Sequence, residues 1–154
     1  MKKIIILSLL LIPWELNAQV ALPTFQGYKI ARPSGSQTFS YTGSAQTFTI
    51  SDFVSTITIK AWGAQGYGTA GLNGVSGAGG KGGYATGNLS VTSGQQVLKV
   101  YVGQQGQGSG HNGGSSYIGG VSSAETIAGN ATMPNPDGGT MTGRTGNGLV
   151  VISW

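Results

Sequence analysis

Cysteine is absent from the sequence, histidine occurs once, and charged residues make up only 8% of the chain. Without cysteine there is no disulfide framework, no thiol nucleophile and no thiolate ligand for a metal. The single histidine, His111, has no second histidine or cysteine with which to form a metal site. No serine lies in a known serine–histidine–acid spacing. The sequence therefore predicts a protein that is not an enzyme and that carries no cofactor.

Carboxylates are scarce too, which leaves a hydrolase as a weaker alternative. A glycosidase needs two carboxyl groups roughly 5 to 9.5 Å apart across a cleft. Asp52 follows a serine at an expected turn and Asp137 precedes a glycine pair, so turn chemistry explains both residues. The basic residues are spread singly along the chain, whereas nucleic-acid binding requires them clustered on one face. We expect no nucleic-acid partner.

One apolar run stands out, at residues 4–12, immediately after two lysines. It ends at Pro13, and a short polar stretch leads to the small-residue step that ends at Ala18. A positive start, an apolar centre and a small-residue end are the order of a secretory signal peptide. A membrane-spanning helix needs about 20 apolar residues, more than this run has. The sequence predicts a signal peptide over residues 1–18 and a secreted or cell-surface mature chain without a membrane span.

The pattern of the mature chain changes at residue 37. Residues 19–36 contain proline and glycine but few alternating apolar residues, and we interpret them as an N-terminal linker. From residue 37 apolar residues alternate with polar ones, which is typical of strands with one buried face. The alternating residues are Phe39 and Tyr41, Phe48 and Ile50, and Ile57, Ile59 and Ala61.

Three further strands are expected at residues 85–91, 97–102 and 149–154, and no segment shows a sustained helical period. Strands from both ends of the sequence bury their apolar faces most simply by packing two sheets together. The sequence therefore predicts one all-β sandwich domain over residues 37–154.

Glycine recurs at every third position between the expected strands. Three residues per turn is the repeat of the polyproline II helix, in which glycine along one edge lets a neighbouring backbone approach closely. This stretch has no proline, so a polyglycine-II type segment is favoured over a collagen-like one. The alternative is a flexible loop of low complexity, but the segment is interleaved with regular strands. The six structural glycines are Gly68, Gly71, Gly74, Gly77, Gly80 and Gly83.

Several short motifs within residues 38–154 carry a family resemblance. They are Trp62-Gly63-Ala64 at the end of one strand, Gly82-Gly83-Tyr84 at the start of the next, and Tyr101-Val102-Gly103 at the close of another. On these motifs the chain resembles the glycine-rich domain of secreted and surface bacterial proteins. It is also similar to the extracellular glycine-rich region of the anaplastic lymphoma kinase and leukocyte tyrosine kinase receptors.

The resemblance implies a jelly-roll-like sandwich, similar to the tumour-necrosis-factor fold, with polyglycine helices inserted between strands. It implies less about function, because the receptors bind protein ligands through this region. The chain departs from larger relatives in lacking their cysteines and their long second glycine-rich run. With no kinase in this sequence, receptor signalling is not expected.

Aromatic rings beside amides and hydroxyls suit the recognition of sugars or proteins, and they supply the candidate binding residues. Of the rings, Trp62, Tyr101 and Trp154 have an alternative role as packing residues at strand ends. We predict that the domain binds an extracellular glycan or protein. The first alternative is a matrix protein that self-associates, in which case the chain forms homo-oligomers. A further alternative is an ice-binding protein with a Thr-rich face. The predicted binding residues are Gln104, Gln105, Gln107, His111, Asn112 and Tyr117.

Overall fold

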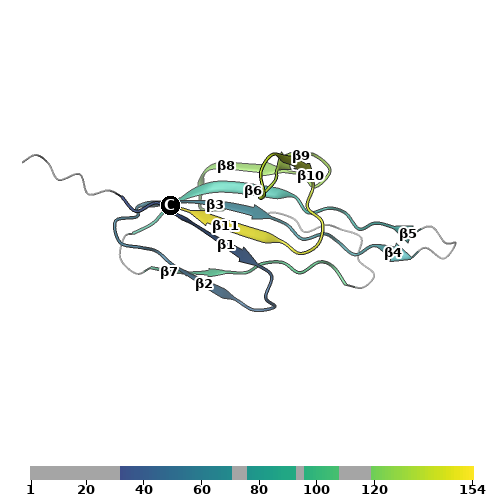
Figure 1. Cartoon of the computed structure of the whole chain (residues 1–154), viewed down its shortest axis with the longest axis horizontal. Coiled ribbons are helices and arrows are strands. Elements are labelled where there is room, and N and C mark those ends of the chain that lie inside the picture. Colours follow the sequence, from purple (N-terminus) through teal and green to yellow (C-terminus); the bar gives the residue numbers. More distant parts are fainter. Residues whose placement is uncertain (1–31, 71–75, 93–95, 108–118) are drawn as a thin grey trace, which may run out of the picture. The chain divides into compact units, whose positions relative to one another are not determined.

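A five-stranded antiparallel sheet forms the centre of the computed structural model, which describes residues 32–70, 76–92, 96–107 and 119–154 (Figure 1). In these residues the structure is all-β and contains no helix, which confirms the predicted fold class at this level. The order of the sheet is β1 (Ser36–Ser40), β11 (Leu149–Ser153), β3 (Thr56–Trp62), β6 (Tyr84–Ser90) and β8 (Ser122–Ile127).

The last strand of the chain lies between two early ones. In β11, Leu149 pairs with Trp62 of β3, and on its other side it pairs with Ser40 of β1. Because side chains alternate across a strand, this register places Ile57 and Ile59 on one face of β3 and Trp62 on the other. The sheet therefore has two faces that each need a cover.

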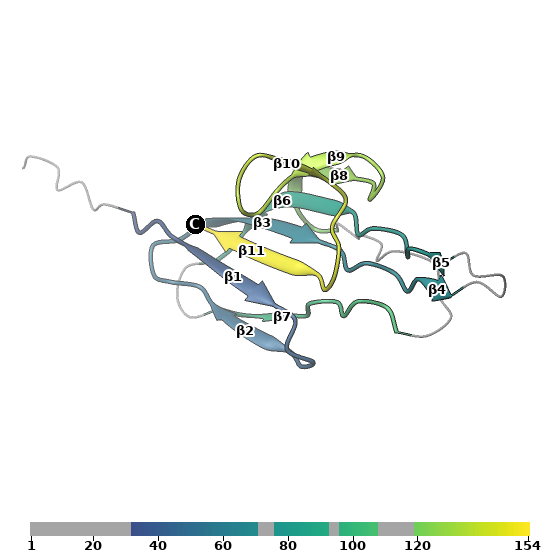
Figure 2. The same ribbon diagram turned by 45° about the vertical axis from the view of Figure 1, so that its right-hand side comes forward.

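A second, two-stranded sheet covers the first face. It consists of β2 (Gln46–Thr49) and β7 (Val97–Val100), paired antiparallel, and it lies apart from β9 and β10 in both ribbon views (Figure 2). The two sheets meet through a buried apolar cluster, as expected from the alternating pattern. Its buried members are Phe39, Phe48, Ile50, Val54, Ile57, Val100 and Ile152.

A short hairpin of β9 (Thr132–Pro134) and β10 (Thr140–Thr142) covers the other face. Met133 of the hairpin is 1% exposed and packs with Trp62, Tyr84 and Leu149. The indole N–H of Trp62 donates to the carbonyl of Pro134 at 2.9 Å. One aromatic residue of β3 thus joins the hairpin to the sheet through both its ring and its polar nitrogen.

The glycine-rich segment differs in part from the prediction. Thr69 and Ala70 form β4 (Thr69–Ala70), which pairs antiparallel with β5 (Ser76–Gly77). Thr69 faces Gly77 in this register, so one of the six predicted glycines lies in a short strand. Gly71 and Gly74 lie outside the described residues.

Candidate binding surface

The segment that follows β3 and the segment that precedes β6 are both rich in glycine, and they are hydrogen-bonded to each other. The N–H of Gly63 donates to the carbonyl of Gly83 at 2.7 Å, and the N–H of Gly66 donates to the carbonyl of Gly80 at 2.8 Å. Each bond is therefore three residues from the next on both segments. An ordinary antiparallel ladder repeats every second residue, so the spacing of these two bonds differs from that of a regular ladder.

Two further segments join the same bundle. The N–H of Gly106 donates to the carbonyl of Gln65 at 2.8 Å, and the N–H of Gln65 donates to the carbonyl of Gly146 at 2.8 Å. Gly148 in turn donates to Gly103 at 2.9 Å. Residues 63–66 therefore have backbone partners from three other parts of the chain, which holds this region in place without a large apolar core.

The contacts between these segments leave no room for a β-carbon at several glycines. A β-carbon on Gly82 would overlap the carbonyl of Gly63, and one on Gly79 would overlap the carbonyl of Gly66. A β-carbon on Gly106 would lie 2.5 Å from the backbone nitrogen of Tyr67. Gly79 and Gly82 were not among the six glycines predicted from the three-residue period, although they adjoin Gly80 and Gly83.

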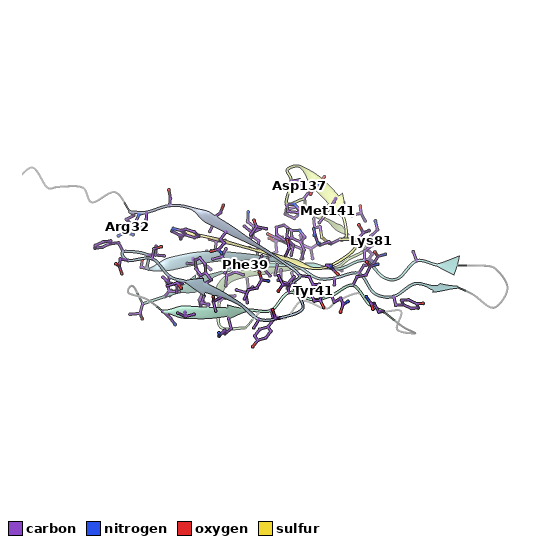
Figure 3. The ribbon with its side chains drawn as sticks, turned by 60° about the horizontal axis from the view of Figure 1, so that its bottom comes forward. Arg32, Phe39, Tyr41, Lys81, Asp137 and Met141 are labelled. Carbon is purple, nitrogen blue, oxygen red and sulfur yellow. The ribbon has the colours of Figure 1, made fainter. Side chains whose placement is uncertain are left out.

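Residues 101–107 form one segment of this bundle and carry several exposed polar and aromatic side chains. Tyr101 is 75% exposed and Tyr67, on the adjoining segment, is 38% exposed. The hydroxyl of Tyr41 donates to Oε1 of Gln104 at 2.9 Å (Tyr41 is labelled in Figure 3). The N–H of Gln105 donates to Oδ1 of Asn147 at 2.7 Å.

We call these residues the tyrosine–glutamine surface, and they comprise Tyr41, Tyr67, Tyr101, Gln104, Gln105 and Gln107. Three of the predicted binding residues, Gln104, Gln105 and Gln107, are exposed on it. The other three, His111, Asn112 and Tyr117, lie outside the described residues. Tyr41 was predicted only as a strand residue.

The structure also sorts the aromatic candidates by burial. Trp62 is 4% exposed and Tyr84 is 2% exposed, with ring centroids 5.1 Å apart, so both are packing residues. Tyr101 is not a packing residue, because three quarters of its surface is exposed. Burial thus leaves Tyr101 and Tyr67 as exposed rings, while Trp154 is half-buried.

Two cationic side chains, Lys81 and Arg144, lie in or next to the glycine-rich segments. Nζ of Lys81 donates to the carbonyl of Thr142 at 2.8 Å, so this side chain is fixed by the hairpin rather than free in solvent (Figure 3). Nε of Arg144 donates to the carbonyl of Asn147 at 2.7 Å. Burial lowers the pKa of Arg144, and the nearby charge of Asp137 opposes that shift. Both cations therefore help to hold backbone carbonyls in place.

Comparison with protein-family models, with curated proteins and with solved structures finds no match for this chain. In the part of the chain that the structure describes, no group of three or more histidine, aspartate and glutamate residues could hold a metal ion. Nor does any helix there have the length and apolar character needed to cross a membrane. The surface itself is therefore the basis for a functional proposal.

Proposed function

We propose that this chain is a secreted, non-enzymatic domain that binds an extracellular glycan through the tyrosine–glutamine surface. The observation that carries the proposal is the 75% exposure of Tyr101 on a backbone segment that is fixed by its neighbours. An exposed ring offers an apolar face to the C–H face of a sugar, and the adjacent amides offer both donors and acceptors to its hydroxyl groups. A surface protein is the other ligand class that such a surface fits.

The rigidity of the segment favours binding. A flexible loop loses conformational entropy when a ligand orders it, and that loss reduces affinity. Here Gly106 is bonded to Gln65, Gly148 to Gly103 and Gln105 to Asn147, so much of the order exists before the ligand arrives. The side chains on offer are neutral, which suits the hydroxyl groups of a sugar.

For the finer architecture we propose a jelly-roll-like sandwich with polyglycine-II type segments between its strands. The pairing of β1 with β11 in one sheet and of β2 with β7 in the other supports the first part, because each pair joins strands that are far apart in sequence. The bonds at Gly63 and Gly66, three residues apart, support the second part. The family resemblance stays a prediction and identifies no ligand.

Removing the ring of Tyr101 tests the binding site. We expect Tyr101→Ala to weaken binding to a glycan recovered from a glycan array by about tenfold, since one buried aromatic contact contributes about 1 to 1.5 kcal/mol. Tyr101→Phe should retain most of the affinity, because the ring remains. Isothermal titration of the secreted domain measures both.

Val97→Ala is the matched control. Val97 is 51% exposed and lies on β7, a few residues before Tyr101. Its substitution therefore reports any general effect of truncating an exposed side chain in this part of the chain. It should leave affinity unchanged. Equal affinity of Tyr101→Ala and the parent domain for every retained ligand would contradict the proposal, and so would a loss that Val97→Ala shares.

The self-associating matrix protein is the second candidate, and β8 is the observation in its favour. This strand lies at the edge of the five-stranded sheet, contains neither proline nor lysine, and has mostly exposed side chains. Yet a register shift between Thr86 and Asn88 and a positive φ at Ser123 distort it, and such irregularities discourage edge pairing. Sedimentation velocity over a range of concentrations separates the two candidates, because only the matrix protein should assemble progressively.

Export is a separate part of the proposal. We expect the protein outside the cytoplasm to begin near Gln19, because the signal peptide is removed during secretion. Intact-mass measurement of the secreted material tests this. An envelope-bound species that retains residues 1–18 would show that the segment anchors the protein.

A further inference from the structure

Phe53 has two features that folding alone does not favour. Its side chain is 62% exposed, the largest exposure of any phenylalanine that the structure describes. Its backbone has φ +66, in the left-handed region that bulky side chains rarely adopt. Residues held in such sparsely populated backbone conformations cluster at active sites and ligand-binding segments.

The residues around Phe53 explain why its ring is presented outward. Ile50 is 1% exposed and Val54 is 5% exposed, so the core fixes both sides of the turn. The N–H of Ile50 also donates to the carbonyl of Gln96 at 2.9 Å. A glycine or an asparagine would fit this left-handed position with less strain, yet the sequence has phenylalanine.

Phe53 borders a cavity of about 290 Å³. Trp154 and Pro33 supply further apolar surface, and Arg32 supplies a positive charge. Among the described residues that line the cavity, Arg32 is the only one with a charged side chain. The remaining lining residues are Ser34, Val54, Ser55 and Thr56.

One wall of this cavity is rigid because Trp154 is held on several sides. The N–H of Gly35 donates to the carbonyl of Trp154 at 2.9 Å, and the N–H of Trp154 donates to the carbonyl of Gly35 at 3.0 Å. The Trp154 ring lies 5.3 Å from that of Phe48, centroid to centroid. A β-carbon on Gly35 would lie 2.7 Å from the Trp154 ring, so the tryptophan occupies space that only glycine leaves free.

We propose that this cavity, the Phe53 cavity, binds a single terminal sugar ring that carries a carboxylate. Ligand cavities begin at about 300 Å³, so this one suits one ring rather than an extended chain. The aromatic and proline surfaces fit the C–H face of a pyranose, and the hydroxyls of Ser55 and Thr56 fit its polar edge. Arg32 favours a carboxylate substituent.

The Phe53 cavity is separate from the tyrosine–glutamine surface. Gly35 immediately precedes β1 and Tyr41 immediately follows it, so the two sites lie at opposite ends of that strand. A strand of this length spans roughly 17 Å at about 3.3 Å per residue. The inference therefore goes beyond the proposed function and does not depend on it.

Substitutions at Phe53 separate binding from folding. We expect Phe53→Gly and Phe53→Asn to raise the melting temperature by about 2 to 5 °C, because they relieve strain. The same variants should bind the sugar at least about tenfold more weakly, because the ring is gone. Phe53→Tyr keeps the ring and should match the parent domain in both measurements.

The probes are the methyl glycosides of glucuronic, galacturonic and N-acetylneuraminic acid. The first two are compared with methyl glucoside and methyl galactoside, which differ only at the carboxylate. We expect at least one acidic glycoside to bind, and a uronide that binds should do so about fivefold more tightly than its neutral counterpart, as one exposed ion pair allows. Arg32→Gln should make a uronide bind no more tightly than its neutral counterpart. If N-acetylneuraminate is the acidic glycoside that binds, Arg32→Gln should weaken its binding about fivefold. Saturation-transfer NMR and titration on the secreted protein measure these effects.

Three results would overturn the inference. One is the absence of binding by all the acidic glycosides. Another is equal binding of acidic and neutral glycosides, which would remove the role of Arg32. The third is binding that survives Phe53→Gly but is lost in Tyr101→Ala, which would assign the sugar to the tyrosine–glutamine surface. Binding that is lost in Phe53→Gly but survives Tyr101→Ala would support a site at the Phe53 cavity even if the proposed function failed.

Discussion

Replacing Gly82 by alanine is expected to destabilise the domain by about 3 kcal/mol, the upper end of the usual cost of overpacking. Gly82 is buried, and its added β-carbon would overlap the carbonyl of Gly63 and lie 3.0 Å from that of Ala64. The clash cannot be relieved by moving Gly82 alone. Its N–H donates to the carbonyl of Arg144 at 2.9 Å, and its own carbonyl accepts from the N–H of Arg144 at 3.0 Å.

Urea denaturation followed by tryptophan fluorescence measures this loss, provided that the slope of the unfolding transition stays the same. Gly139→Asn is the matched control. Gly139 has φ +73 and no atom within 4 Å of an added β-carbon, and asparagine tolerates that backbone conformation. It should cost less than about 1 kcal/mol. Equal tolerance at Gly82 and Gly139 would show that the glycine-rich segments are not packed as the structure has them.

The packing of the glycine-rich segments could be predicted only in part from the spacing of the glycines. A three-residue period predicted that glycines from Gly68 to Gly83 meet a neighbouring backbone, and Gly80 and Gly83 do accept bonds from Gly66 and Gly63. Gly68 also lacks room, since an added β-carbon would lie 2.6 Å from the carbonyl oxygen of Gly77, but within this segment the tighter contacts are at Gly79 and Gly82, which the period did not select. Within a glycine doublet, the sequence cannot tell which member faces the neighbour, because that depends on the tertiary pairing with residues 63–66.

Strands that carry an apolar alternation or an apolar run were predictable, and strands with neither were not. The pattern of Ile57 and Ile59 located β3 because the sheet buries only one face of that segment. In β8 the residues from Ser122 to Thr126 are all exposed, so no apolar alternation marks the strand. It exists through its backbone pairing with β6, which a single sequence does not display.

The binding surface was predictable in part for a similar reason. Gln104, Gln105 and Gln107 stood out because they lie in a glycine-rich stretch directly after an expected strand. Tyr84 and Tyr101 look alike in sequence, since each lies near one end of an expected strand and within two residues of a glycine, but one is 2% exposed and the other is 75% exposed. The difference arises because β9 and β10 cover Tyr84, and their position was not foreseen.

Trp62→Ala is expected to cost about 4 kcal/mol, within the range for removing a buried tryptophan. Trp62 is 4% exposed, and its loss would open a cavity between the sheet and Met133. It would also leave the carbonyl of Pro134 without the indole donor. Tyr101→Ala is the control, because truncation of a 75% exposed ring should change stability by less than about 0.5 kcal/mol.

Trp62→Phe separates the two contributions of the indole. Phenylalanine keeps most of the packing against Tyr84 but cannot donate to Pro134, so we expect a loss of about 1 to 2 kcal/mol. That hydrogen bond joins β3 to β9, so its loss should accelerate exchange of the backbone amide hydrogens of Met133 and Met141. Exchange in β11 should accelerate less, because β11 is paired with β1 on one side and β3 on the other. Uniform acceleration across β9, β10 and β11 would mean that the hairpin unfolds only with the whole domain. Unchanged exchange at Met133 would mean that packing alone holds the hairpin on the sheet.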